Sequence, residues 1–157
     1  MRACIQRTLQ ASVQLLDEDN RVVSQIGRGL LILLGVGQED SEEDARRLAQ
    51  KISKLRIFDD GAGKMNLDVH DVGGEILVVS QFTLYANSVK GNRPSFTDAA
   101  PPDKAKELYR SFVCELASLG LSVKEGVFRA NMGVALVNDG PVTIWLDTVD
   151  LFGNKRS

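Results

Sequence analysis

The sequence is poor in the residues that most often bind metals or act with a nucleophile. It contains one histidine, His70, and two cysteines, Cys4 and Cys114. These residues are too few for a zinc site of the usual ligand spacing, and neither a metal nor a cofactor is expected. His70 lies in the polar stretch 68–71, which we interpret as a surface loop, and this argues against a Ser-His-Asp triad. The cysteines lie within apolar patterns and are expected to be small buried residues in a reducing compartment.

Long hydrophobic runs are also missing. No apolar run approaches the roughly 18 residues that a membrane-spanning helix needs. Residues 1–4 lead directly into a strand-like pattern, without the features of a signal peptide. We therefore expect a cytoplasmic protein without a membrane partner. With 157 residues, of which 43% are hydrophobic and 25% charged, the composition fits a single globular domain.

An excess of positive charge is the third feature that the sequence lacks. It has 19 basic and 21 acidic residues, which gives a net charge of −2. Proteins that bind long nucleic acids through phosphates usually carry a basic domain, so DNA is not expected as a partner. This balance still allows an enzyme that contacts only the end of an RNA. We interpret the basic residues of one predicted helix as a solvated face: Arg46, Arg47, Lys51, Lys54 and Arg56.

Strand-like patterns and two long helical patterns make up most of the chain. Ser41 and Asp44 resemble a capping box, which predicts that a helix begins there. A second helix is predicted to begin at 101–103 and to end at Gly120, with Tyr109 and Phe112 on its buried face. Because strands and helices do not alternate regularly, we predict an α+β fold in which two long helices cover a curved, barrel-like sheet. The predicted strands are 2–8, 11–16, 21–26, 30–36, 75–82, 132–138 and 142–148.

The most informative segment begins with the apolar run 76–79, which is typical of a strand that is buried on both faces. Ser80, Gln81, Phe82 and Thr83 follow this run without a break. Binding and catalytic groups often lie where a strand of a rigid scaffold ends. Most polar strand ends carry no chemistry, however, and this segment alone is also explained by a strand that reaches the surface.

A second segment, 138–143, reads Asn-Asp-Gly-Pro-Val-Thr and lies between two strand-like runs. Ordinary turn chemistry accounts for Asn, Asp, Gly and Pro at such a place. Asn138 is expected to cap this turn and not to contact a substrate.

Together, 80–83 and 138–143 resemble the paired signature motifs of the D-aminoacyl-tRNA deacylases. The resemblance implies one deacylase domain at 1–148, a polar tail at 149–157, and a compact homodimer without a cofactor. It also implies that the aminoacyl-tRNA 3′ end is the partner. Further segments resemble the family in the family's order: Ile5-Gln6-Arg7, Leu33-Leu34-Gly35-Val36, Leu55-Arg56-Ile57-Phe58, Gly63-Lys64-Met65-Asn66 and Arg93-Pro94-Ser95-Phe96.

The implied reaction is hydrolysis of the ester that joins an amino acid to the terminal adenosine. An ester is already activated, so positioning and oxyanion stabilisation provide most of what hydrolysis needs. Two mechanisms are open. Thr83 attacks the ester, or backbone N–H groups near Phe82 and Thr83 hold the carbonyl while the substrate's 2′-hydroxyl directs water. A threonine hydroxyl without a base is a poor nucleophile, which favours the second mechanism. Ser80 and Gln81 would then shape the site.

The resemblance assigns chiral selection to Gly140 and Pro141, whose peptide bond is cis in the family. The pair is expected to reach into the partner subunit's pocket and to reject L-aminoacyl esters actively. Since glycine has no side chain to clash, glycyl-tRNA would also be hydrolysed.

Three further residues match family positions. Arg7 matches a residue that steadies the Gly-Pro loop, although an exposed arginine on a strand is the plain alternative. Met132 and Phe128 match positions near the terminal adenosine, and both fit equally well in a hydrophobic core.

Other functions remain open at this point. A relative with a trans Gly-Pro bond that acts on mischarged L-alanyl-tRNA departs from the Ser-Gln-Phe-Thr pattern, which this chain keeps at 80–83. A non-catalytic module that binds the end of an RNA would bind without cleaving. A purely structural dimer would leave the polar strand end unexplained.

Overall fold

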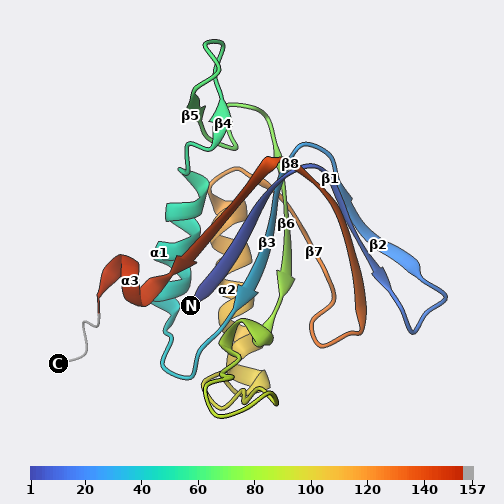
Figure 1. The fold of residues 1–157 in the computed structure, drawn as a ribbon. Helices are drawn as coiled ribbons and strands as arrows, with labels where there is room; N and C mark the ends of the chain where they lie inside the picture. The colour runs from blue at the N-terminus through green and yellow to red at the C-terminus, as the bar shows by residue number, and fades with distance from the viewer. Residues whose placement is uncertain (154–157) are drawn as a thin grey trace.

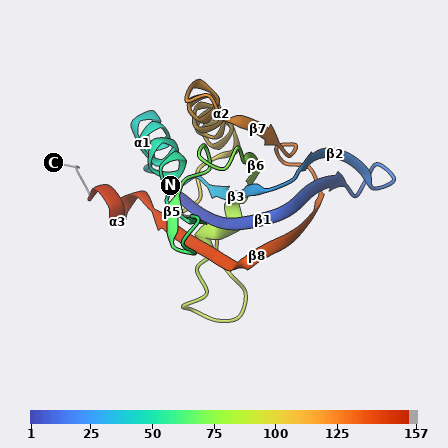
Figure 2. The ribbon, with the colours of Figure 1, turned by 90° about the horizontal axis from the view of Figure 1, so that it is seen from above.

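A rolled sheet with two helices against one face makes up the body of the molecule (Figure 1). The computed structural model describes residues 1–153, and the order of its larger sheet is β2-β1-β3-β6-β7, with β8 paired to β1. In Figure 2, α1 and α2 lie side by side over β3 and β6, and β8 lies beyond β1, on the side away from these helices. The predicted α+β class and barrel-like sheet are therefore confirmed. The strands are β1 (Arg2–Leu15), β2 (Arg21–Ile26), β3 (Gly29–Gly35), β6 (Glu75–Ser80), β7 (Ser122–Glu125) and β8 (Met132–Asp147), with a small β4 (Phe58–Asp59) and β5 (Met65–Leu67) hairpin.

The central strands β3 and β6 are buried on both faces because the rolled sheet separates two hydrophobic clusters. Ile76 and Val78 of β6 pack in the cluster under the helices. Leu77 and Val79 point the other way, into a smaller cluster that β1, β2 and β8 enclose. Alternate side chains of a strand point to opposite faces, so an unbroken apolar run is what this position requires.

Two pairs of predicted strands are each one long strand in the structure. The predicted strands 2–8 and 11–16 are both part of β1, and 132–138 and 142–148 both belong to β8. β1 pairs with β3 through its first half and with β2 through its second half, while β8 follows it along both. This continuous pairing carries each strand through its bend, and the register of the β1–β8 pair shifts near Thr8.

The two long helices are α1 (Glu42–Ser53) and α2 (Pro102–Ser118). The predicted capping box is confirmed, since the Ser41 hydroxyl accepts from the Asp44 backbone and the Asp44 carboxylate accepts from the Ser41 backbone. Tyr109 and Phe112 of α2 are buried, as predicted. No helix within residues 1–153 is long and apolar enough to cross a membrane.

Three smaller features differ from what the sequence led us to expect. Residues 150–152 of the predicted polar tail belong to a short helix α3 (Thr148–Phe152), whose Phe152 ring packs under the Arg47 guanidinium at 3.9 Å from the ring centre. The rest of the predicted tail, 154–157, lies outside the described residues. Cys4 is only half-buried and Cys114 is exposed, because each lies off the apolar face of its element. Strand β7 was not predicted, since its sequence is short and mostly polar.

Candidate functional site

A cavity of about 270 Å³ opens where β6 ends, between that strand end, α2 and the start of β8. The predicted site residues Ser80, Gln81 and Phe82 line one wall, and Phe128 and Met132 line the other. The structure therefore brings together five residues that the sequence places in two distant segments. The remaining lining residues are Leu34, Val36, Val79, Ala105, Tyr109, Arg129, Ala130 and Val134.

The polar segment turns sharply as it leaves the sheet. The backbone N–H of Gln81 donates to the carbonyl of Leu34 at 2.8 Å, which is the last ladder bond beside β6. The chain then forms a single 3-10 turn, η1 (Phe82–Tyr85). Phe82 is 58% exposed and meets the edge of Phe96 with 5.0 Å between ring centres. An aromatic ring that remains this exposed beside a cavity is available for contact with a ligand.

Thr83 differs from the other three residues of its motif. Its side chain is exposed and does not line the cavity, and its hydroxyl accepts a hydrogen bond from the amide Nε2 of Gln81. An amide nitrogen that donates a hydrogen bond cannot take up a proton. The hydrogen-bond partner of the Thr83 hydroxyl is therefore not a general base, and this geometry does not favour a nucleophile.

The opposite wall of the cavity is hydrophobic and closely packed. The Tyr109 and Phe128 rings lie 5.9 Å apart, and the Tyr109 hydroxyl donates to the carbonyl of Val78 at 3.0 Å. Burial raises the pKa of Tyr109 well above its usual range, so this hydroxyl stays neutral. Gly126 leaves room for Met132, because a Cβ at Gly126 would lie 2.8 Å from the Met132 sulfur. Phe128 and Met132 are thus half-buried residues of a cavity wall.

The turn η1 is held from behind by a buried carboxylate that the sequence analysis did not single out. Asp40 is 7% exposed, and its Oδ2 accepts from the Tyr85 hydroxyl at 3.2 Å and from the Gly37 N–H at 2.6 Å. Its Oδ1 accepts from the α-amino group of Met1 at 2.6 Å. Burial, with the nearby Asp40 charge, raises the pKa of Tyr85 far above its usual range. Only the folded arrangement joins these residues, so no local sequence signal could have indicated them.

Arg2 completes this support on the other side of Tyr85. Its guanidinium lies 4.4 Å from the centre of the Tyr85 ring and donates to the Leu84 carbonyl at 2.9 Å. Tyr85, which ends η1, is therefore held through its hydroxyl and through its ring face. The two exposed residues of the turn, Phe82 and Thr83, are connected to this rigid support.

The second motif forms the bend of β8, and its Gly140–Pro141 peptide bond is cis. Both residues are exposed. Asn138 caps the bend as predicted: its Oδ1 accepts from the Val142 N–H at 2.6 Å and its Nδ2 donates to the Val142 carbonyl at 3.2 Å. Gly140 has a φ of +133°, in a region that favours glycine.

Arg7 anchors this bend from the inside. The side chain is almost fully buried and donates to the carbonyl of Asp139 at 2.9 Å and to that of Ile57 at 2.7 Å. The carboxylates of Asp59 and Asp139 lie 3.6 and 3.5 Å from its guanidinium. The alternative of an exposed arginine on a strand is therefore wrong for Arg7. Its burial could not be seen in the sequence, because Ile57 and Asp59 come from a distant hairpin.

Within one chain the two motifs lie at different levels of the sheet (Figure 1). Through the strand pairing, Ser80 lies level with Leu34 and Ala3, whereas Gly140 and Pro141 lie beside Arg7. Four residues of β1 separate these levels, which corresponds to about 13 Å along the strand. Neither Gly140 nor Pro141 lines the cavity. The structure of a single chain thus does not bring the two motifs together.

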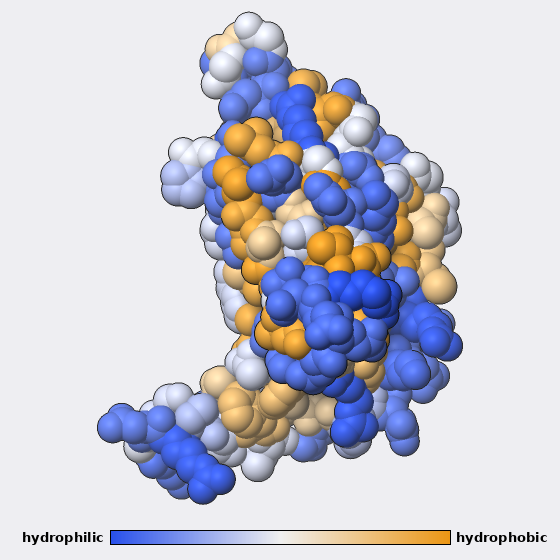
Figure 3. Space-filling model, turned by 90° about the vertical axis from the view of Figure 1, so that its right-hand side faces the viewer, coloured by the Kyte–Doolittle hydropathy of each residue, from blue (hydrophilic) through white to orange (hydrophobic). Residues whose placement is uncertain are grey.

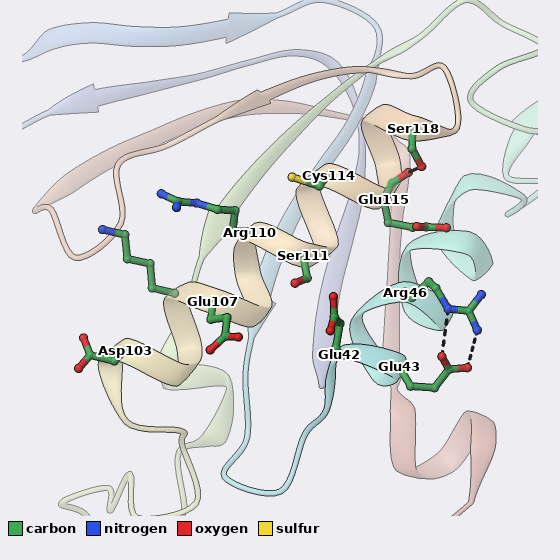
Figure 4. Close-up of a pocket in the computed structure, with 11 residues that line it drawn as sticks. Glu42, Glu43, Arg46, Asp103, Glu107, Arg110, Ser111, Cys114, Glu115 and Ser118 are labelled. Atoms are coloured by element: carbon green, nitrogen blue, oxygen red, sulfur yellow. Dashed lines mark hydrogen bonds and ion pairs between the residues drawn. The ribbon is translucent and has the colours of Figure 1, made fainter.

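A larger depression of about 1050 Å³ runs between α1 and α2 (Figure 4). Its lining mixes acidic and basic side chains, and one pair, Arg46 and Glu43, is bonded within it. It contains none of the residues of either motif. Among residues 1–153, no three His, Cys, Asp or Glu side chains are grouped as metal ligands. The cavity at the end of β6 is therefore the candidate site.

Comparison with known proteins shows the family of this chain. The family model of D-Tyr-tRNA(Tyr) deacylase matches residues 4–147, which include every candidate residue of both motifs. The chain belongs to this family. A D-aminoacyl-tRNA deacylase of Thermotoga petrophila is 57% identical over 97% of this chain and 100% of its own length. A D-aminoacyl-tRNA deacylase of Roseiflexus castenholzii is 58% identical over 100% of this chain and 98% of its own length.

Solved structures of the deacylase fold are similar over nearly the whole chain. The c-Myc DNA unwinding element binding protein has a TM-score of 0.86 at 42% identity, and the match covers 94% of this chain and 98% of that one. A probable eukaryotic D-amino acid tRNA deacylase has a TM-score of 0.78 at 18% identity, with 92% and 97% covered. At that identity, the second likeness shows a shared fold alone.

Proposed function

We propose that this protein hydrolyses the ester bond of D-aminoacyl-tRNA and releases the free D-amino acid and tRNA, as a proofreading step of translation. The observation that carries this proposal is the family match over residues 4–147. The cavity beside Ser80, Gln81 and Phe82 agrees with it, because a hydrophobic wall for a nucleoside faces a polar wall for an ester. No cofactor or DNA partner is proposed.

In this mechanism water is the nucleophile and the 2′-hydroxyl of the terminal adenosine directs it. Backbone N–H groups of Phe82 and Thr83 hold the ester oxygen as negative charge develops on it. Gln81 orients Thr83 through the hydrogen bond between their side chains. The buried support behind Tyr85 keeps these backbone groups in place, which is the preorganisation that such a mechanism needs.

Chiral selection is proposed to come from Gly140 and Pro141 of a second copy of the chain. These residues are exposed and held firmly by Arg7, yet they lie away from their own cavity. Backbone atoms placed in the partner's pocket would clash with an L-side chain and would spare D-residues and glycine, so glycyl-tRNA is also a proposed substrate. Arg7 acts here as a positioning residue.

Two features support a homodimer. β8 pairs with β1 alone among the described strands, so its other edge is open along the strand. Apolar side chains are exposed on neighbouring strands, including Leu9, Val137 and Trp145 at 55%, 43% and 49%. Figure 3, which views the side with the β1–β2 hairpin, shows hydrophobic surface between hydrophilic areas. An open edge and exposed apolar residues together favour association.

The first experiment compares D-tyrosyl-tRNA with L-tyrosyl-tRNA and follows loss of the ester. Loss of the D-ester alone is the expected result. Loss of both esters would keep the hydrolase and remove the proposed filter. Loss of neither, with tRNA still bound, would instead support a module that binds the end of an RNA without cleaving it. Dilution to monomers is expected to abolish turnover, and full activity of a monomer would contradict a filter supplied by the partner.

A further inference from the structure

A second hollow adjoins the candidate site on the far side of Phe128. It has a volume of about 290 Å³, and it shares Tyr109 and Phe128 with the site cavity. The Phe128 ring is therefore a wall between two adjacent spaces. A chain-like ligand that extends from the site cavity past Phe128 would enter the second hollow.

Three cations surround this continuation. Lys106 and Arg110 line the second hollow, and Arg129 lines the mouth of the site cavity. All three side chains are exposed, and within residues 1–153 none of them has an ion-pair partner. Glu125 is the one carboxylate among the described residues that line the second hollow. Lys106 and Arg110 also line the depression between α1 and α2, together with Asp103 and Glu107 of their own helix. Within the second hollow itself, two cations accompany one carboxylate, although the whole chain carries a net charge of −2.

The backbone arranges these cations along one path. Lys106 and Arg110 are four residues apart on α2, so their side chains are neighbours on one helical face. Figure 4 shows Arg110 pointing from α2 away from α1, and thus away from the acidic residues of α1. Arg129 has a φ of +65°, a conformation that residues other than glycine seldom adopt and that is common at functional sites.

We propose that Arg129, Arg110 and Lys106 bind the phosphates that precede the terminal adenosine in the single-stranded 3′ end of tRNA. This rests on the proposed function, which places that adenosine in the site cavity. Three cations match a short stretch of backbone and not a long duplex, which agrees with the acidic balance of the rest of the chain. The path would supply affinity for RNA without reading its sequence, because phosphate contacts carry no sequence information.

Binding of uncharged tRNA at several salt concentrations tests this path directly. Each phosphate contact on a single strand contributes about 0.7 to the slope of log affinity against log salt concentration. The double variant Lys106→Gln/Arg110→Gln should therefore lower the magnitude of the slope by about 1.4. Over the tenfold range from 1 M to 0.1 M salt, this difference in slope corresponds to roughly 25-fold. The affinity of the double variant at 0.1 M salt should therefore be lower than that of the wild type by about this factor. The matched control is Lys51→Gln/Lys54→Gln, which removes the same charge from exposed positions at the end of α1 and its C-cap, and should keep the wild-type slope.

A second measurement uses the ester of D-tyrosine with adenosine, a substrate that has no phosphate. The ratio of kcat/KM for D-tyrosyl-tRNA to kcat/KM for this ester should fall by a similar factor in the Lys106/Arg110 variant. An unchanged slope, or an equal change in the control variant, would overturn the phosphate path. If the Lys106/Arg110 variant reduces the slope as expected but the wild-type protein cleaves neither ester, the proposed function would be overturned. The phosphate path would remain supported.

Discussion

The two motifs of the deacylase family are supported in opposite ways. Ser80, Gln81 and Phe82 line a concave cavity, and a buried network at Asp40 and Tyr85 holds the turn that follows them from behind. The Gly140–Pro141 bend is exposed; the Arg7 side chain holds it from within, and Asn138 caps it. One region is shaped to receive a ligand and the other to be presented to something else. The two regions do not meet in one chain.

Loss of the Arg7 side chain is expected to have the largest effect, and this effect is on stability. Replacing Arg7 by Met removes two charge-assisted hydrogen bonds, to the carbonyls of Asp139 and Ile57. Each such bond contributes about 1.5–3 kcal/mol, so the free energy of unfolding should fall by roughly 3 kcal/mol or more. Urea denaturation would measure this loss. If Arg7→Met unfolds at the wild-type urea concentration, the bend does not depend on Arg7.

Substitution at the bend itself should affect activity more than stability. A Cβ at Gly140 would lie 2.8 Å from Val142 Cγ2, in a residue with φ +133°. A small displacement of positioning groups can cost about 100-fold in rate, so Gly140→Ala should lower kcat/KM by that order. Gly63→Ala is the matched control, because Gly63 has φ +75° and open space around it. If the two variants lose equal activity, the bend has no special role.

A substitution at Tyr85 tests the buried support behind the cavity. Tyr85→Phe removes one hydrogen bond to Asp40 and leaves the ring and its contact with Arg2 in place. A bond to a charged partner contributes about 1.5 kcal/mol, which corresponds to roughly tenfold in kcat if the turn moves. The loss should appear in kcat and not in KM, because Tyr85 does not line the cavity. An equal rise in KM would indicate a general loosening of the fold.

The sequence predicts those features of the two regions that depend on contacts between neighbouring residues. It does not predict the features that depend on contacts between distant segments. The strand predicted at 75–82, which the structure has at 75–80, and the cap at Ser41 were predicted because their signals are local. The role of Asp40 was not predicted, because its partners Met1 and Tyr85 come from distant segments. A steadying role for Arg7 was expected only from the family resemblance, and its burial was not, because Ile57 and Asp139 lie far from it in the sequence. Likewise, the bends of β1 and β8 resembled strand ends because nothing local shows that their pairing continues.

Alkaline pH provides a test of the buried tyrosines on the cavity side. Burial raises the pKa of Tyr85 and of Tyr109 in the folded chain above the ordinary value of 10.0. The unfolded chain therefore loses protons first, and the free energy of unfolding should fall as pH rises above about 10. Each tyrosine contributes about 1.4 kcal/mol per pH unit to this fall. Tyr85→Phe should reduce the slope of unfolding free energy against pH by one such contribution, and an unchanged slope would contradict burial of the hydroxyl.

The smallest effect is expected at Thr83, although it belongs to the signature motif. Its hydroxyl contacts the Gln81 amide and does not line the cavity, so Thr83→Ala removes one neutral hydrogen bond at an exposed position. Such a bond contributes about 1 kcal/mol, and kcat should fall by roughly fivefold or less. Loss of a true nucleophile costs several orders of magnitude, on the order of 10⁴-fold or more. Single-turnover hydrolysis of D-tyrosyl-tRNA separates these cases: a loss of that size would make Thr83 the attacking group and would move catalysis from the backbone of the turn to its side chain.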